Sequence, residues 1–235
     1  TSIFFLDEDQ KVALSDIGSF EEISGWAHHF GAQVLELDLQ SQFRCSGSDL
    51  YMAWLDNTLG IRDTAHQFLD KTDYDIEVMS NPEELHEKIK RLNEEKNSAR
   101  LVAGYCYRWA SKKDTLAWDI DFPEHGYRAK WNLASHGSTW IENPNSVTEV
   151  GCIHTCQGLE VDHIGVIIGK DMIFKDGEIN TNYLARDRYD KTIRGSKKLV
   201  RQYGDQAIEQ LDRIIRNTYR TLMTRGMKSC SVWCE

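Results

Sequence analysis

Short apolar runs alternate along the chain with amphipathic stretches, and this alternation constrains the fold more than any other feature. Strands are predicted at 2–6, 33–39, 74–79, 100–106, 148–153, 161–168 and 229–234, and helices at 19–30, 48–59, 81–96 and 205–224. A strand followed by a helix and a further strand builds a parallel sheet with helices on its faces. The sequence therefore predicts an α/β fold with a mostly parallel sheet. Because every apolar run is far shorter than the roughly 20 residues that span a bilayer, no membrane partner is expected.

Local signals mark several of these elements. Ser19 and Glu22 have the spacing of a capping box, in which each side chain accepts from the other residue's backbone amide. Asn81-Pro82-Glu83 combines an N-cap, a proline at the first helical position and an acid in the first turn. Lys175-Asp176-Gly177 separates two short apolar runs and predicts a hairpin.

The alternation stops between Tyr107 and Val147, where we expect a β-rich or loop insertion. Four tryptophans lie in it: Trp109, Trp118, Trp131 and Trp140. Exposed tryptophans stack on nucleic-acid bases, whereas buried ones pack an irregular segment onto a sheet. Packing is the interpretation that we favour.

Charge is distributed unevenly. The chain has a formal net charge of −9, which argues against nonspecific nucleic-acid binding by the whole surface. Residues 186–228, however, contain 12 basic and 5 acidic residues, a net charge of +7, whereas the first 185 residues carry 16 basic and 31 acidic residues, a net charge of −15. Two interpretations follow: a face that attracts phosphate, or a helix surface whose arginines pair with neighbouring carboxylates.

The six cysteines are scattered, which favours a reducing compartment such as the cytoplasm. Cys152 and Cys156 flank His154, but no second ligand pair lies nearby at zinc-site spacing. We therefore expect buried, reduced thiols and no metal.

Four strings carry residues suited to phosphate chemistry, three of them beside predicted strand ends: Asp7-Glu8-Asp9-Gln10, Leu39-Gln40-Ser41-Gln42-Phe43-Arg44, Cys152 to Glu160, and Asn217 to Gly226. Open α/β sheets bind ligands at the carboxyl ends of their strands. The guanidinium of Arg44 suits two phosphate oxygens, and Gly158 permits close backbone approach. Simpler roles stay open, because an acidic turn can solvate a strand end and Arg225 can complement the dipole of a helix end.

Taken together, these strings resemble the second motor lobe of superfamily 1 helicases. His154-Thr155-Cys156-Gln157-Gly158-Leu159-Glu160 is similar to the fifth helicase motif, although Cys152 stands where a threonine is usual. The segment 39–44 resembles the fourth motif and 219–226 the sixth. Within the superfamily, the chain looks most like an uncharacterised bacterial group of ATP/GTP-binding proteins related to the Schlafen helicase region. The resemblance implies a three-layer RecA-like, P-loop NTPase-type fold.

The resemblance also implies roles for single residues. Arg44 and Arg225 would reach the γ-phosphate as arginine fingers, and Gln10 would sense it. Glu160, Gly158 and Gln157 would face the nucleotide, with Glu160 on the ribose. His154 and Thr155 would contact the backbone of a single strand, which we expect to be DNA.

The turn at residues 7–10 could be the second helicase motif or the third. The 34 residues from Gln10 to Arg44 favour the third. Residues 1–18 would then end the first motor lobe, and residues 19–235 would form the second lobe, with the insertion at about 107–147. No Gly-x-x-x-x-Gly-Lys-Ser/Thr string occurs in the sequence.

We therefore expect a piece of a longer, two-lobed protein. ATP and Mg²⁺ would bind that protein, and this chain alone would bind neither and hydrolyse nothing. The partners would be the first motor lobe of the same polypeptide and a single strand. Two other functions stay open. One is a nucleotide-dependent regulatory or binding module without unwinding activity. The other is a nuclease, which is disfavoured because no cluster of Asp and Glu with metal-ligand spacing occurs outside these strings.

Overall fold

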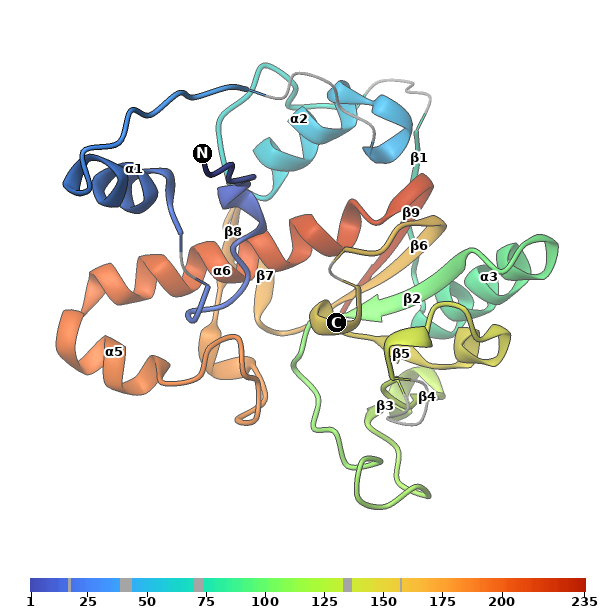
Figure 1. The fold of residues 1–235 in the computed structure, drawn as a ribbon. Coiled ribbons are helices and arrows are strands. Elements are labelled where there is room, and N and C mark those ends of the chain that lie inside the picture. Colours follow the sequence, from blue (N-terminus) through green and yellow to red (C-terminus); the bar gives the residue numbers. More distant parts are fainter. Residues whose placement is uncertain (17, 39–43, 70–73, 133–136, 157) are drawn as a thin grey trace.

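A five-stranded parallel sheet forms the centre of the protein in a computed structural model, which describes residues 1–235 except 17, 39–43, 70–73, 133–136 and 157 (Figure 1). Its strand order is β1-β9-β6-β2-β5. The strands are β1 (Asp75–Val78), β2 (Ala99–Ala103), β5 (Val150–Gly151), β6 (Val161–Ile168) and β9 (Gly226–Cys234). Every pairing in this sheet is parallel, which confirms the predicted α/β class.

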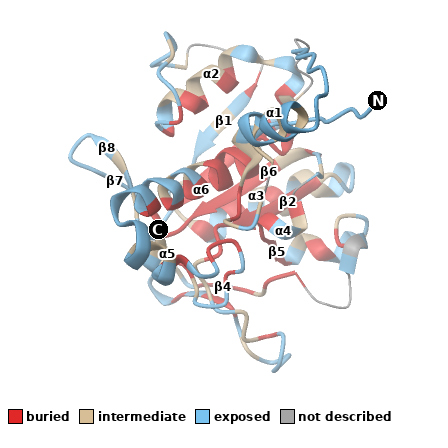
Figure 2. Cartoon of the chain, turned by 60° about the vertical axis from the view of Figure 1, so that its left-hand side comes forward, coloured by how far each residue is buried: buried red, intermediate tan, exposed pale blue. Residues whose placement is uncertain are grey.

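Helices cover both faces of the sheet. Helix α3 (Pro82–Glu95) packs on one face, where Leu101 and Ala103 join its apolar residues. Helices α2 (Asp49–Thr58) and α6 (Asp205–Met223) pack on the other face, with Val102. Because neighbouring residues of a strand point to opposite faces, one strand supplies both cores. The result is the three-layer, RecA-like arrangement, with buried residues on the sheet and on the side of α6 that faces it (Figure 2).

The predicted helix starts are confirmed. Helix α1 (Phe20–His29) begins with the complete Ser19–Glu22 capping box, and Asn81 accepts from the Glu83 amide at the start of α3. Helix α6 has the predicted bounds within a residue. A helix that we did not predict, α5 (Ser196–Tyr203), precedes α6 and packs against it.

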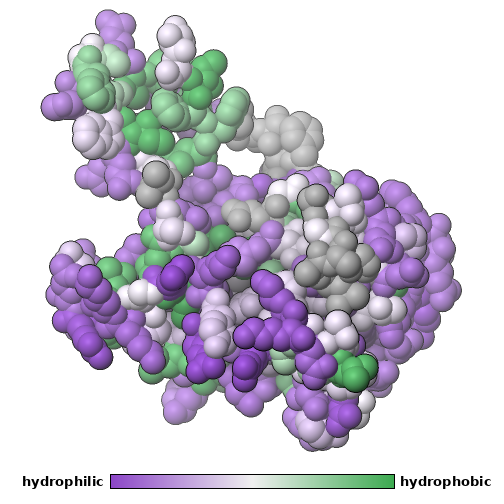
Figure 3. Space-filling view, turned by 60° about the horizontal axis from the view of Figure 1, so that its bottom comes forward, coloured by the Kyte–Doolittle hydropathy of each residue, from purple (hydrophilic) through white to green (hydrophobic). Residues whose placement is uncertain are grey.

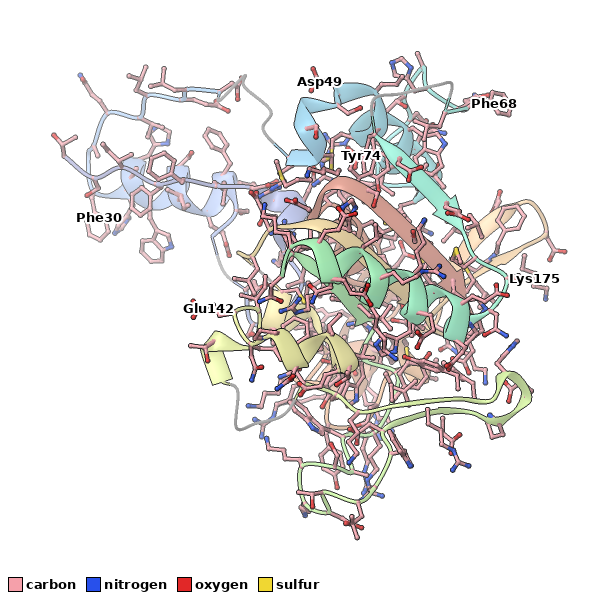
Figure 4. The ribbon with its side chains drawn as sticks, turned by 90° about the vertical axis from the view of Figure 1, so that its right-hand side faces the viewer. Phe30, Asp49, Phe68, Tyr74, Glu142 and Lys175 are labelled. Atoms are coloured by element: carbon pink, nitrogen blue, oxygen red, sulfur yellow. The ribbon has the colours of Figure 1, made fainter. Side chains whose placement is uncertain are left out.

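Two predicted strands are wrong. Residues 2–6 form no strand, and Ile3, Phe4 and Phe5 are between 66% and 84% exposed. Residues 33–38 are likewise not a strand, and residue 39 lies outside the described residues. A strand needs a neighbour for its backbone hydrogen bonds, and apolar composition alone does not supply one. Helix α1 projects away from the sheet, with Phe30 at its end (Figure 4).

The insertion contains an antiparallel pair, β3 (Ile120–Phe122) and β4 (Tyr127–Ala129), among short 3-10 turns. Trp131 and Trp140 are at most 1% exposed, so for these two the packing interpretation is confirmed. Trp109 is half-buried and packs against the same apolar cluster as Trp131, which also agrees with the packing interpretation, whereas Trp118 is 50% exposed. The predicted hairpin is present as β7 (Met172–Lys175) and β8 (Glu178–Thr181). Among the described residues, no helix is long and apolar enough to cross a membrane.

Candidate functional site

Three predicted site residues meet at the amino-terminal edge of the sheet. Glu160 directly precedes β6 and Arg225 directly precedes β9, and the Val161 amide donates to the Arg225 carbonyl oxygen at 2.9 Å. Arg44 begins a short 3-10 segment, Arg44–Gly47, whose Ser46 hydroxyl donates to the Met227 carbonyl oxygen at 2.6 Å. The string 152–160 begins after β5, and Arg225 lies just beyond the end of α6, as expected. The expectation that Arg44 follows a strand is wrong, because no strand leads to it from the described residues.

Arg225 is a buried cation with incomplete compensation. Its side chain donates from Nε to the Thr221 carbonyl oxygen at 2.9 Å and from Nη1 to the Leu159 carbonyl oxygen at 3.2 Å. Its Nη2 is buried without a hydrogen-bond partner, and no carboxylate of the described residues lies within ion-pair distance of the guanidinium. The Thr221 contact fits the helix-dipole role, because this carbonyl belongs to the last turn of α6.

Electrostatics at this edge favour an anion. Burial lowers the pKa of the Arg225 guanidinium from its usual value, and the nearby charge of Arg44 lowers it further. The charge of Glu160 raises the pKa of Arg225, but the Glu160 side chain is exposed to solvent. Two guanidiniums that repel each other are both stabilised when an anion lies between them.

The loop before β6 brings Glu160 to this edge. A cavity of about 10 Å³, room for one water molecule, is lined by Arg225, Glu160 and Trp140 among others. Gly158 has φ +85, a left-handed conformation that suits glycine. Gln157, which we expected to face the nucleotide, lies outside the described residues.

Asp7 connects Gln10 with Arg44. Residues Glu8–Gln10 form a 3-10 turn, and the Gln10 side-chain amide donates to Asp7 Oδ2 at 2.5 Å. Arg44 Nη1 lies 3.6 Å from the same carboxylate oxygen. The third and fourth predicted motifs therefore meet through one carboxylate, although 34 residues separate Gln10 from Arg44.

The other arginines of α6 have structural partners. Arg213 pairs with Asp9 at 3.0 Å, Arg216 with Asp212 at 2.7 Å, and Arg220 with Asp56 at 2.5 Å. For this helix the carboxylate-pairing interpretation of the basic segment is confirmed. The pair with Asp56 holds α6 against α2 and the pair with Asp9 holds it against the acidic turn at residues 8–10, whereas Arg216–Asp212 lies within α6.

His154 and Thr155 lie on α4 (Ile153–Cys156), which follows the carboxyl end of β5. His154 is exposed, and the Thr155 hydroxyl donates to Asn132 Oδ1 at 2.8 Å. Both line a groove of about 1270 Å³, together with Tyr105, Arg108 and Trp109. Asn132 and Arg108 were not predicted as site residues, although basic and aromatic residues are neighbours in the insertion at Arg108-Trp109 and Lys112-Lys113.

The cysteines around His154 are free thiols, and Cys152 and Cys156 are buried as expected. Burial raises the pKa of both. In the part of the chain that the structure describes, no three His, Cys, Asp or Glu side chains are grouped to hold a metal ion.

Comparison with known proteins gives two findings. The family model for the Schlafen group 3 DNA/RNA helicase domain matches residues 1–235. The "Uncharacterized protein YPL245W" of Saccharomyces cerevisiae (strain ATCC 204508 / S288c) is 21% identical over 209 residues, which are 83% of this chain and 44% of the yeast protein. The chain therefore spans less than half the length of that curated relative.

Proposed function

The chain belongs to the family of Schlafen group 3 DNA/RNA helicase domains, and from this premise we propose that it is the second RecA-like lobe of an ATP-dependent helicase or translocase. The observation that carries the proposal is the buried, incompletely compensated guanidinium of Arg225 beside Arg44. Buried polar atoms in proteins are almost always satisfied, so Arg225 Nη2 is available to donate to a group from outside the chain. A nucleotide phosphate has the negative charge and the acceptor oxygens that Arg225 Nη2 lacks among its described partners.

Each side chain has a defined part in this proposal. Arg44 and Arg225 offset the charge that develops on the γ-phosphate oxygens, and Gln10, tied to Arg44 through Asp7, senses the phosphate. Glu160 accepts from the ribose hydroxyls, and Gln157 and Gly158 contact the nucleotide beside it. ATP with Mg²⁺ supplies the phosphoanhydride that is cleaved, and the preceding lobe holds most of both.

The first lobe of the same polypeptide is the proposed partner. Residues 1–18 would belong to its end, and they carry the exposed Ile3, Phe4 and Phe5. A contiguous exposed apolar surface marks a docking site. All six cysteines are free, which suits the cytoplasm as the compartment.

ATP hydrolysis by the full-length protein tests the arginines. We expect Arg44→Ala and Arg225→Ala each to reduce turnover by roughly a thousandfold, the usual effect of losing an arginine finger. Arg128→Ala, which removes an exposed arginine of β4, is the control and should leave turnover unchanged. Near-normal turnover of either finger variant would contradict the proposal, as would robust hydrolysis by the 235-residue chain alone.

A regulatory module is the alternative. Single strands should stimulate hydrolysis by a translocase, and a partial duplex should be unwound by a helicase. Hydrolysis without either response would favour a module that reports nucleotide state to a partner.

A further inference from the structure

The groove beside His154 lies at the carboxyl ends of two neighbouring strands. Tyr105 follows β2, and α4 follows β5, which pairs with β2 in parallel. Carboxyl ends are where open α/β sheets bind ligands. At about 1270 Å³ the groove exceeds the roughly 300–1,000 Å³ of ordinary small-molecule sites, so it suits an extended ligand.

The groove is positively charged although the whole chain is acidic. Arg108, Lys112, Lys113 and Lys191 line it, and Asp114 is the one carboxylate among the described lining residues. Lys112, Lys113 and Lys191 are exposed. Figure 3 views the molecule from this side, where hydrophilic side chains dominate the surface. Such a local concentration of cations attracts a phosphate backbone.

The wall that carries Arg108 to Asp114 is fixed in place. The buried Asp119 accepts from the Ser111 amide at 2.7 Å, from the Ser111 hydroxyl at 2.5 Å and from the Trp131 amide at 2.9 Å. Trp131 stacks on Tyr105 with ring centroids 5.3 Å apart. The Thr155–Asn132 hydrogen bond joins this wall to α4. A site held in this way is preorganised, which reduces the entropic cost of binding.

Aromatic rings in the groove come with cations. The Lys112 ammonium lies 5.3 Å from the centroid of the half-buried Trp109 ring. The Arg188 guanidinium lies 4.7 Å from the centroid of Tyr189, which is 57% exposed. Rings that stack on bases beside cations that meet phosphates are the recurring parts of single-strand sites. A duplex keeps its base faces stacked inside, so it cannot use such rings.

We propose that this groove binds single-stranded nucleic acid and extends the strand path from His154 and Thr155 across the insertion. Trp109 stacks on a base, and Lys112, Lys113 and Lys191 contact phosphates. The inference rests on the proposed function, because the strand path is taken to begin at His154 and Thr155.

Fluorescence anisotropy of a labelled 20-nucleotide oligo(dT) with the full-length protein, without nucleotide, tests the groove. We expect K112A/K113A to bind about tenfold more weakly and to lower the slope of log affinity against log salt by about 1.4, because each single-strand phosphate contact contributes about 0.7. The control K197A/K198A removes the same charge from exposed positions of α5 and should change neither quantity. Equal effects of the two double variants would overturn the proposal.

Trp109 gives a second, independent readout. Trp109→Ala should weaken binding at least fivefold with an unchanged salt slope, and Trp109→Phe should restore most of the affinity, because a base stacks on either ring. A loss that Phe does not restore, or equally tight binding of a blunt 20-base-pair duplex, would contradict a single-strand site.

Hydrolysis without nucleic acid separates this inference from the proposed function. The groove variants should keep the basal rate, because Trp109, Lys112 and Lys113 do not line the cavity beside Arg225. Suppose that K112A/K113A binds oligo(dT) normally while Arg225→Ala abolishes hydrolysis. The groove would then not be the single-strand site, and the proposed motor function would still stand. Groove-dependent binding by a protein that never hydrolyses ATP would reject the motor and leave the groove.

Discussion

His86 is a buried histidine whose two ring nitrogens both have partners. Nε2 lies 2.9 Å from the Val147 carbonyl oxygen, which can only accept, so Nε2 carries the proton. Nδ1 then accepts from the Tyr127 hydroxyl at 2.9 Å. Burial lowers the pKa of His86 to about 4. The neutral ring therefore ties α3 to the insertion.

This histidine makes stability depend on pH. The unfolded chain binds a proton near the usual histidine pKa of about 6.5, whereas the folded chain resists protonation down to about pH 4. Stability is therefore lost as pH falls below about 6.5, by about 2 kcal/mol at pH 5. Urea unfolding of the wild type and of His86→Gln at pH 7.5 and 5 checks this, because the other groups cancel in the difference. A difference that stays constant with pH would contradict the shifted pKa.

Asp56 is a buried carboxylate between two arginines. It pairs with Arg220 Nε at 2.5 Å and with Arg62 Nε at 3.2 Å. Asp56→Asn leaves Arg220 buried without its closest counter-charge, so we expect a loss of about 3–5 kcal/mol in the free energy of unfolding. The control Asp121→Asn breaks an exposed pair with Arg128 and should cost at most about 1 kcal/mol. Similar losses in the two variants would mean that Asp56 is not electrostatically buried.

At the scale of elements, local patterns predicted what local forces determine. The apolar stripe of α6 and the apolar run of β6 predicted the bounds of these two elements closely. A helix buried on one side has apolar residues at every third or fourth position, and a fully buried strand has a continuous apolar run. Residues 2–6 have a similar apolar run but form no strand, because no other strand of the described chain lies beside them to accept their backbone hydrogen bonds. The amino-edge meeting of Arg44 and Arg225 and the Thr155–Asn132 contact depend on strand order, which no local pattern encodes.

Packing of α3 on the sheet requires a glycine. A Cβ at Gly165 would lie 2.8 Å from side-chain atoms of Ile89 and Leu101, so any larger residue pushes α3 away from β6. We expect Gly165→Ala to cost about 1–3 kcal/mol of unfolding free energy in thermal or urea melts. Gly25→Ala is the matched control, since α1 leaves open space there and the helix should gain about 0.5–1 kcal/mol. Equal effects at the two glycines would contradict this packing.

At the scale of the whole molecule, the two candidate regions use opposite strand ends of one sheet but adjoin, because Trp140 and Leu159 line both cavities. Arg44 and Arg225 lie at the amino-terminal end of β9, whereas the groove follows β2 and β5. The segment from α4 to Glu160 runs between the two edges and contributes side chains to both. The described residues of this segment therefore connect the proposed single-strand groove with the proposed nucleotide site.

The exposed apolar surface of residues 1–38 gives a prediction for the isolated chain. Hydrophobic side chains gather on the projecting N-terminal part (Figure 3), where Trp26 and Phe30 stack with ring centroids 6.1 Å apart. Because each buried Phe contributes about 1.5–3 kcal/mol, this surface should drive self-association when no other lobe covers it. Sedimentation velocity should show less association for F4S/F5S than for the wild type.

The control for this experiment is I173S/F174S, which removes an exposed apolar pair from the β7–β8 hairpin. Phe174 is 76% exposed and pairs with Ile179 across the hairpin, so this apolar pair belongs to the hairpin and not to the surface of residues 1–38. We expect this variant to associate as the wild type does. If both double variants reduce association equally, general hydrophobicity rather than a docking surface drives it, and the case for a first lobe seated on residues 1–38 loses its physical basis.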